Sequence, residues 1–138
     1  MGKLTRSEVT LRIFGELLEP DEITRIVRCS PTRSCRAGEL MKSPSGKPLR
    51  KAKEGAWMLK AETRSPANLD DQIMNLFTQL NPETEIWAKI NQNYRAELFC
   101  GLMLETFNEG IGLKGQTIRE IGSRGLLIDF DIYYLNED

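Results

Sequence analysis

A short polar segment in the first third of the chain carries side chains that could hold an anion. It contains two guanidinium groups, a hydroxyl group and a glycine: Arg33, Ser34, Arg36 and Gly38. These groups complement phosphate or carboxylate oxygens when a turn brings them together. The same segment could instead be structural, with its arginines paired to carboxylates such as Glu39 or Asp131. No Gly-Lys-Ser or Gly-Lys-Thr step of a nucleotide-binding loop occurs, so nucleotide hydrolysis is not supported.

This segment belongs to a strongly basic part of the sequence. Residues 25–64 hold eleven of the nineteen lysines and arginines but only three glutamates, a local charge of +8 in a chain of net charge -1. The lysines have no interleaved aromatic residues, and the sequence pI is about 5.7, whereas nucleic-acid binders usually add stacking side chains or a recognition helix. Nucleic acid is therefore disfavoured as a partner. A solvated loop is the favoured interpretation of these lysines. As a partner for the basic segment, an acidic protein surface or a small anion is favoured over RNA or DNA.

Charged and aromatic residues alternate along the predicted strands. Arg12 and Arg95 would share one side of a sheet with Asp129 and Asp131 if helices cover the other side. Cross-strand pairing of these charges would stabilise an open sheet face modestly. Alternatively, this face binds a protein partner or forms a homodimer, because arginine and aromatic anchors dominate interface energies. Trp57 completes the set of candidate binding residues.

The composition excludes several kinds of catalytic site. Histidine is absent, which removes Ser-His and Cys-His triads and histidine-containing zinc sites. Asp129 and Asp131 lack a third carboxylate of clear placement, and Cys29 and Cys35 lack the spacing of a zinc site. We therefore expect no metal, no cofactor and no catalytic residue. The three cysteines are expected to be reduced thiols.

Length and hydropathy predict one domain over residues 1–138. Residues 30–54 are rich in proline, glycine and basic side chains, so we expect a basic loop there that is partly mobile. Apolar runs are far shorter than the roughly 20 residues that span a bilayer, and the chain does not begin with a signal-peptide pattern. The sequence therefore predicts a cytoplasmic protein without membrane contact.

Periodicity predicts alternating strands and helices. Period-two patterns indicate strands, and apolar residues at helical spacing after proline, Asn68 or glycine indicate helices. The expected strands are 8–14, 55–61, 94–103 and 126–134, with a further short edge strand possible at 32–36, and the expected helices begin near residues 20, 69, 83 and 115. Two strand-helix-strand halves joined by central helices predict an α+β, ferredoxin-like two-layer sandwich. Its mainly antiparallel sheet would have four to five strands and helices on one face.

Several short motifs follow one another in a particular order: Leu11-Arg12-Ile13-Phe14-Gly15, Pro20-Asp21-Glu22-Ile23, Pro31-Thr32-Arg33-Ser34, Arg36, Gly38-Glu39, Gly55, Trp57, Gly125-Leu126 and Asp129-Phe130-Asp131-Ile132-Tyr133. Their order and spacing, over nearly the whole chain, resemble a bacterial family, domain of unknown function 4279. That family usually has an aromatic residue where this chain has Cys35. The resemblance implies a bacterial, single-domain, cytoplasmic protein, and it brings no established activity.

These observations favour a non-enzymatic binding module. The basic loop and the open sheet face would engage a protein partner or a small anionic ligand, and an immunity-protein-like role against a toxin is one concrete form of this hypothesis. The alternative is an enzyme that uses Arg33, Arg36, Asp129 and Asp131 on an anionic substrate. The enzyme hypothesis requires these residues to converge in a concave pocket, whereas the binding hypothesis requires a broad exposed patch of arginines and aromatics.

Overall fold

The computed structural model describes residues 2–42 and 45–135. In chain order, the elements are β1 (Gly2–Lys3), β2 (Arg6–Gly15), α1 (Pro20–Val27), β3 (Arg33–Cys35), β4 (Leu40–Lys42), β5 (Pro48–Lys51), β6 (Gly55–Lys60), α2 (Leu69–Gln79), α3 (Thr84–Asn93), β7 (Arg95–Leu104), β8 (Glu109–Gly110), α4 (Gly115–Ser123) and β9 (Leu127–Tyr134). Each strand and helix expected from periodicity is present, with ends shifted by one or two residues. The short pairs β1–β8 and β4–β5 were not expected.

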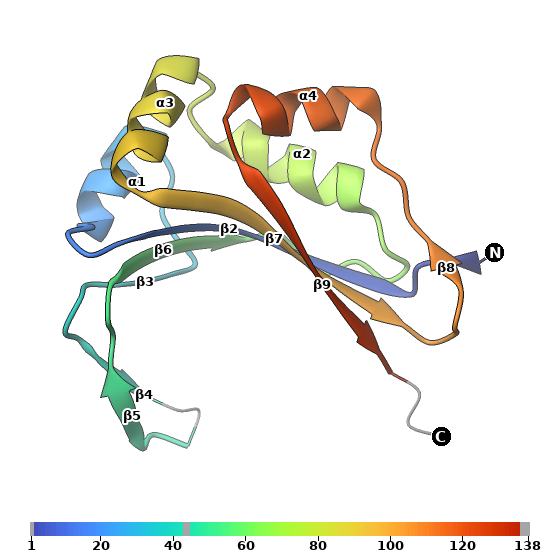
Figure 1. Ribbon diagram of the computed structural model, residues 1–138, viewed down its shortest axis with the longest axis horizontal. Coiled ribbons are helices and arrows are strands. Elements are labelled where there is room, and N and C mark those ends of the chain that lie inside the picture. Colours follow the sequence, from blue (N-terminus) through green and yellow to red (C-terminus); the bar gives the residue numbers. More distant parts are fainter. Residues whose placement is uncertain (1, 43–44, 136–138) are drawn as a thin grey trace.

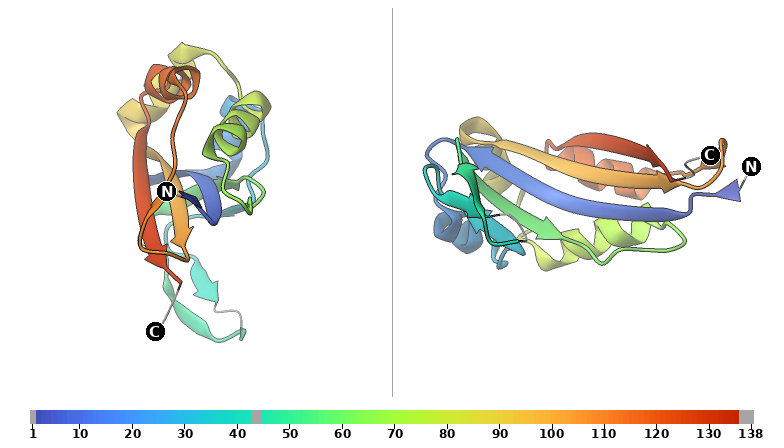
Figure 2. Two further views of the ribbon diagram at one scale, coloured as in Figure 1. Left: turned by 90° about the vertical axis from the view of Figure 1, so that its right-hand side faces the viewer. Right: turned by 90° about the horizontal axis from the view of Figure 1, so that it is seen from below.

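The described strands form one main sheet of five in the order β3-β6-β2-β7-β9. Neighbouring strands are antiparallel except β7 and β9, which are parallel because α4 carries the chain back to the starting end of the sheet. Helices α1 to α4 cover one face, and the other face is open (Figure 1; Figure 2). The expected α+β sandwich with a mainly antiparallel sheet is confirmed. The strand order differs from that of a ferredoxin-like fold. Here the parallel strands β7 and β9 are direct neighbours, whereas the split βαβ unit of the ferredoxin-like fold places another strand between its two parallel strands.

Alternation along the central strands separates the two faces. On β2, Val9, Leu11 and Ile13 are fully buried under the helices, whereas the intervening residues are partly exposed on the open side. The same alternation continues on β6 and β7, so the core lies entirely between the sheet and the helices. The largest buried side chains come from these strands and from the inner faces of the helices, among them Trp57, Trp87, Leu11, Ile13, Ile23, Ile73, Leu76 and Leu98.

Local sequence explains where the helices begin. α1 starts at Pro20, whose missing N–H is one that a first turn leaves unpaired, and Asp21 and Glu22 lie near the positive end of the helix dipole. Asn68 caps α2, because its Oδ1 accepts a hydrogen bond from the backbone N–H of Asp71 at 3.2 Å. Within the described residues, no helix has the length and apolar content needed to cross a membrane.

The described part of the basic segment at 30–54 contains three short strands where the sequence predicts a loop, and residues 43 and 44 of this segment lie outside the described residues. β3 adds to the edge of the main sheet beside β6, as the short edge strand at 32–36 predicts. β4 and β5 then pair as an antiparallel hairpin, with Leu40 opposite Lys51 and Met41 opposite Arg50. This hairpin projects from the end of the sheet on the side opposite the helices (Figure 1). It therefore stands beside the open face and gives that end of the face a wall.

Candidate functional site

A groove lies between the β4–β5 hairpin and the open face of the main sheet. It encloses about 280 Å³ and is lined by Phe14, Cys35, Met41, Arg50, Lys51, Ala52, Lys53, Glu54, Ala56 and Met58. A smaller hollow of about 50 Å³ continues it along β3 and reaches Arg33. We call this surface the hairpin groove. Its floor is largely apolar, and its hairpin wall is basic.

Strand register explains how the floor is assembled. Partners in an antiparallel pair point to the same side of a sheet, so Ala56 and Met58 on β6 lie on the open face with Phe14 and Arg12 on β2. β3 pairs with the other edge of β6, where Cys35 lies opposite Ala56 and Arg33 lies opposite Met58. Cys35 and Arg33 therefore also lie on the open face. Met41 was not predicted as a site residue, and the hairpin cations were expected only as members of the basic loop. Their alternation in Leu40-Met41-Lys42 and Leu49-Arg50-Lys51 was a signal for paired strands, but the intervening prolines and glycine favoured a loop.

A row of alternating arginines and phenylalanines extends the floor of the hairpin groove across the open face. The guanidinium carbon of Arg95 lies 4.9 Å from the ring centroid of Phe14, and that of Arg12 lies 5.6 Å from the same ring. Arg12 also stacks over Phe99 at 4.3 Å. These distances are within the range of cation–π attraction. Phe14 belongs to both the groove and this row, so the two form one continuous surface.

Carboxylates hold the two arginines of this row in place. Arg12 bonds Glu97 at 2.6 Å and lies 3.7 Å from Asp129, and Arg95 bonds Glu54 at 2.7 Å. The bond from Glu54 raises the pKa of the Arg95 guanidinium, with the charge of Glu97 adding to the effect. Cross-strand pairing of Arg12 with Asp129, anticipated from alternation, is therefore present but secondary to the pair with Glu97. Both side chains keep donors on a partly exposed surface while their orientation is fixed.

The structure does not assemble the predicted anion pocket from Arg33, Ser34, Arg36 and Gly38. Arg36 turns to the acidic start of α1, bonding Glu19 at 2.6 Å and lying 3.8 Å from Asp21. The backbone N–H of Gly38 donates to the carbonyl of Ala52 at 2.8 Å, so it closes the base of the hairpin. Ser34 alternates with Arg33 along β3, although both residues line the smaller hollow. The ion pairs of Arg36 and the hairpin-closing bond of Gly38 match the structural alternative for these two residues, and they separate both from Arg33.

Arg33 remains a candidate binding residue. Its side chain is on the open side of β3 at the end of the hairpin groove. Among the residues that the structure describes, Arg33, Arg50 and Lys51 form no ion pair. Their charges are therefore available to an external carboxylate or phosphate. In contrast, Arg36 also lies 3.8 Å from Glu39, so it is neutralised within the chain.

Trp57 is a core residue and its assignment to a binding site is corrected here. It is fully buried, and its indole N–H donates to the hydroxyl of Thr24 on α1 at 3.0 Å. It pairs with Ile13 across β2 and β6, on the helix-covered face. The period of two that places Met58 in the groove necessarily turns Trp57 away from it.

The carboxylates of β9 lie at the far edge of the main sheet from β3. Asp129 is near Arg12, and Asp131 accepts a hydrogen bond from the hydroxyl of Tyr133, which raises the pKa of that phenol. Three strands separate β9 from Arg33, so the arrangement of arginines and aspartates required by the enzyme hypothesis is not formed. Within residues 2–42 and 45–135, no three histidine, cysteine or acidic side chains gather as metal ligands.

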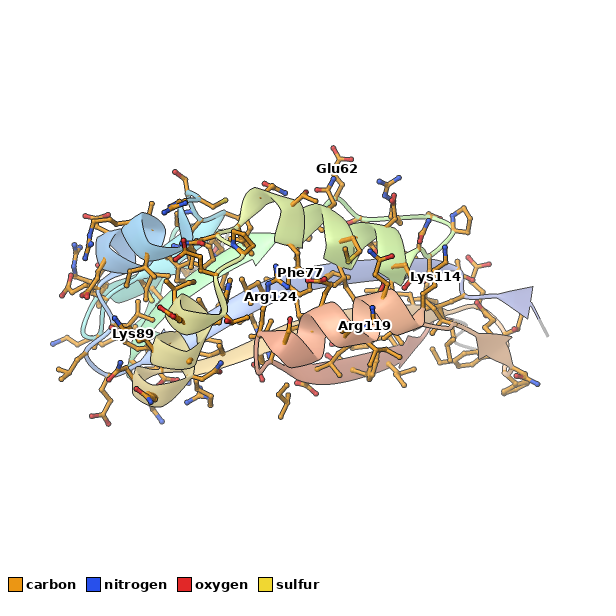
Figure 3. All side chains as sticks on the ribbon, turned by 90° about the horizontal axis from the view of Figure 1, so that it is seen from above. Glu62, Phe77, Lys89, Lys114, Arg119 and Arg124 are labelled. Carbon is orange, nitrogen blue, oxygen red and sulfur yellow. The ribbon has the colours of Figure 1, made fainter. Side chains whose placement is uncertain are left out.

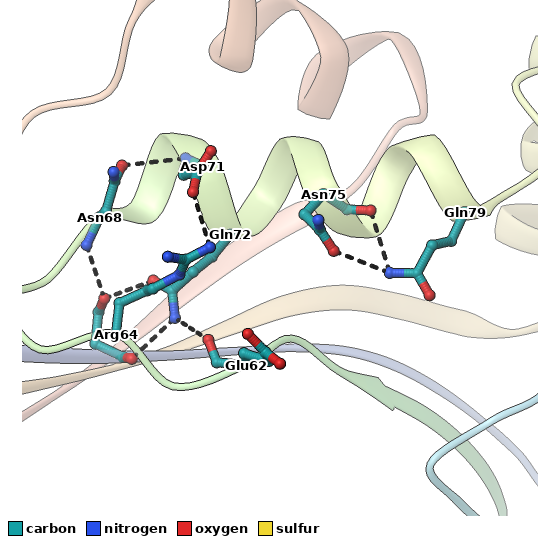
Figure 4. A network of polar contacts seen from close by, with 8 residues as sticks. Glu62, Arg64, Asn68, Asp71, Gln72, Asn75 and Gln79 are labelled. Carbon is teal, nitrogen blue, oxygen red and sulfur yellow. Dashed lines mark hydrogen bonds and ion pairs between the residues drawn. The ribbon is translucent and has the colours of Figure 1, made fainter.

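A second cavity, of about 370 Å³, lies beside α2 and is lined by polar residues. Figure 4 shows its network. The amide of Gln72 is buried and donates to the carbonyls of Ser7 and Glu62, both at 2.9 Å, and Arg64 bonds Asp71 at 2.9 Å. These bonds tie α2 to the chain that leaves β6. The polar groups of this cavity therefore hold the fold together, and the hairpin groove is the stronger candidate for binding.

Arg124, which was not predicted from the sequence, is buried between the helices. Only 5% of its side chain is exposed, and its guanidinium stacks over Phe77 at 4.1 Å and bonds Glu120 at 2.7 Å (Figure 3). Asn91 on α3 donates to its backbone carbonyl at 2.8 Å. Arg124 therefore joins α2, α3 and α4. From the sequence, an arginine just beyond the end of a predicted helix is expected to be exposed to solvent. Its contacts with three helices are visible only in the tertiary structure.

The fold and the groove together define a small α+β domain whose sheet keeps one open, partly walled face. The chain belongs to the family described as Domain of unknown function (DUF4279), which matches residues 3–135. The resemblance found in the sequence is thereby confirmed. No curated protein and no solved structure matches the chain. The family description assigns no activity.

Proposed function

We propose that this protein is a non-enzymatic binding module of the bacterial cytoplasm that engages an acidic, partly apolar segment of a protein partner in the hairpin groove. The observation that carries the proposal is the combination of an apolar floor with unpaired cations at its margin. Phe14 and Met58 provide the floor, and the hairpin wall contributes Met41 together with the cations Arg50 and Lys51. An immunity-protein-like inhibition of a toxin is one concrete form of such binding.

Each part of the groove favours a protein segment as the ligand over a small anion. Methionine side chains are flexible and polarisable, so Met41 and Met58 can adapt to apolar side chains of a partner. A small anion would gain little from this floor. The adjoining row of Arg95, Phe14 and Arg12 supplies the kind of anchors that dominate protein interfaces. The cations would speed association with an acidic partner and make affinity fall with salt.

Fluorescence anisotropy with dye-labelled peptides tests this proposal. The probes are short peptides in which glutamate or aspartate alternates with leucine or phenylalanine, and matched peptides with glutamine and asparagine in place of the acids. Wild type should bind the acidic set in preference, and the double variant Arg50→Glu, Lys51→Glu should bind it at least about tenfold more weakly. Met58→Asp should also weaken binding, because it puts a charge on the apolar floor.

A matched control is available on the opposite face. The double variant Lys89→Glu, Arg119→Glu makes the same change of net charge on exposed residues of α3 and α4, which lie on the helix side (Figure 3). This variant should keep the affinity of wild type. If both double variants lose affinity equally, only net charge is being measured and the groove is not the site.

Two further measurements in the same anisotropy experiment distinguish between the possible ligands. Inorganic phosphate should not displace a bound peptide, because it makes no use of the apolar floor. Equal affinity for a single-stranded DNA oligonucleotide and for the acidic peptides would overturn the proposal in favour of charge-only polyanion binding. The absence of saturable binding to every acidic peptide by wild type would also overturn it.

A further inference from the structure

The outer edge of β9 is a second surface with properties of its own, at the far side of the main sheet from the hairpin groove. Among the described strands, β9 pairs only with β7 and so forms an edge. Edge strands present unpaired backbone N–H and C=O groups, and natural sequences usually protect them with charge, proline or bulges. β9 runs for eight residues without proline, and its register with β7 is continuous. It is therefore well suited to accept another strand.

The direction of the backbone groups can be derived from the pairing with β7. The N–H of Leu135, just beyond β9, donates to the carbonyl of Leu104 at 2.7 Å. Because backbone groups alternate in direction along a strand, the odd-numbered residues turn theirs toward β7. Phe130, Ile132 and Tyr134 therefore direct their N–H and C=O groups to the outer edge.

The same three residues leave apolar surface exposed. Phe130, Ile132 and Tyr134 belong to the helix-covered side of β9, yet 43%, 60% and 41% of their surfaces are exposed. Ile118 on α4, which packs against β9, is also exposed. Phe107 stacks on Tyr134 with ring centroids 5.4 Å apart. The helix layer thus covers only part of the edge strand and leaves an apolar strip there.

We propose that β9 pairs in antiparallel fashion with β9 of a second copy of this chain, around a two-fold axis at Ile132. Such an axis, perpendicular to the sheet, keeps both helix layers on one side and creates a continuous sheet across two chains. On the helix side, Ile132 lies opposite its own copy and Phe130 lies opposite Tyr134. On the open side, Asp131 lies opposite Tyr133 of the second copy, so each Tyr133 hydroxyl can exchange its bond to Asp131 of its own chain for a bond to Asp131 of the other copy.

Charge selects this register over its neighbours. An axis at Asp131 would place two copies of that carboxylate directly opposite each other, and an axis at Phe130 would oppose Asp129 and Asp131 twice. Like charges opposite each other destabilise strand pairs. An axis at Tyr133 avoids this repulsion but pairs fewer residues within the described strand. The register centred on Ile132 is the longest one without opposed aspartates, and this self-complementarity favours a second copy over a foreign strand.

Analytical ultracentrifugation of the full chain, from micromolar to submillimolar concentrations, tests the proposal. Wild type should form a dimer in a concentration-dependent manner. Tyr133→Asp would oppose a new carboxylate to Asp131 at two symmetric places, so the dimer Kd should rise about tenfold. Tyr133→Lys should lower the dimer Kd, because the same two places become opposite-charge pairs.

Leu127 provides the matched control. It lies on the same side of β9 but outside the paired stretch 129–135, so Leu127→Asp and Leu127→Lys should leave dimerisation unchanged. Ile132→Pro is an independent variant, because it removes an outward N–H and leaves the bonds to β7 intact, a position where an edge strand tolerates proline. It should give a folded monomer by circular dichroism.

Two results would overturn the dimer. One is a wild-type chain that stays monomeric over the whole concentration range, which leaves β9 to a foreign strand or to none. The other is a dimer that neither Tyr133→Asp nor Ile132→Pro weakens, which places the interface elsewhere. The peptide experiments on the hairpin groove are independent of both results, because the groove lies at the opposite edge.

Discussion

One face of the main sheet packs against helices, whereas the other carries charged and aromatic side chains beside a basic hairpin. The two faces share the same strands and differ only in which alternate residue they receive. Both even contain an arginine stacked on phenylalanine: Arg124 over Phe77 among the helices, and Arg12 over Phe99 on the open side. The difference lies in burial. The buried apolar side chains lie on the covered face, so we expect substitutions there to cost more stability than substitutions on the open face.

Thiol labelling should give the largest contrast between the faces. Cys100 is fully buried on the covered side of β7, and this burial together with the charge of Asp129 raises the pKa of its thiol to about 12. Cys35 lines the hairpin groove. In a Cys29→Ser background, Ellman's reagent should modify Cys35 in the folded state, whereas Cys100 should require opening that costs up to the global unfolding free energy, about 5–15 kcal/mol.

Mass spectrometry of partly labelled protein identifies which thiol has reacted. The label on Cys35 should also slow in the presence of a peptide that occupies the groove. Equal rates at Cys35 and Cys100 in the absence of denaturant would mean that the covered face is not closed to solvent.

Core truncation should give the next largest effect. Trp57→Ala would remove a fully buried indole and its hydrogen bond to Thr24, so the free energy of unfolding should fall by about 3–5 kcal/mol. Phe99→Ala, on the open side of β7, should cost only about 1 kcal/mol, because the ring is partly exposed. Urea denaturation followed by circular dichroism measures both. A similar loss in the two variants would contradict the division of roles between the faces.

The two stacked arginines allow a closer comparison. Arg124→Ala should lower the free energy of unfolding by about 2 kcal/mol, since its stem and guanidinium fill the space between three helices. Arg12→Ala should cost about 1 kcal/mol, because 25% of this side chain is exposed and its ion pairs are partly hydrated. Arg124→Met, which keeps the packing of the stem, should recover part of the loss. If Arg12→Ala is the more damaging variant, the open face contributes to stability more than its exposure suggests.

Charge reversal in the hairpin groove should have the smallest effect on stability. Arg50→Glu, Lys51→Glu alters two exposed side chains that have no ion-pair partner among the described residues. The free energy of unfolding should change by less than about 0.5 kcal/mol. Calorimetric melting of this variant beside wild type checks the value. A drop of several kcal/mol would show that the hairpin cations support the fold, and lost peptide binding could then be an indirect effect.

Local patterns fixed which side chains belong to which face. A period of two along residues 8–14 and 94–103 was enough to separate buried from open positions, and Asn68 marked the start of α2 correctly because a cap depends only on neighbouring residues. The same alternation places Trp57 in the core. Its prediction as a binding residue therefore disagreed with the alternation of its own strand.

The composition and periodicity of the sequence by themselves determined an α+β sandwich with one open face, because alternation and helical spacing are properties of nearby residues. Only the tertiary structure decided which of the charged residues meet. Arg36 reaches Glu19 on α1, Arg12 reaches Glu97 on β7, and Arg33 remains far from Asp131. These outcomes depend on strand order and on the β4–β5 hairpin, which bring together residues distant in the chain. The basic segment became one wall of a groove for the same reason.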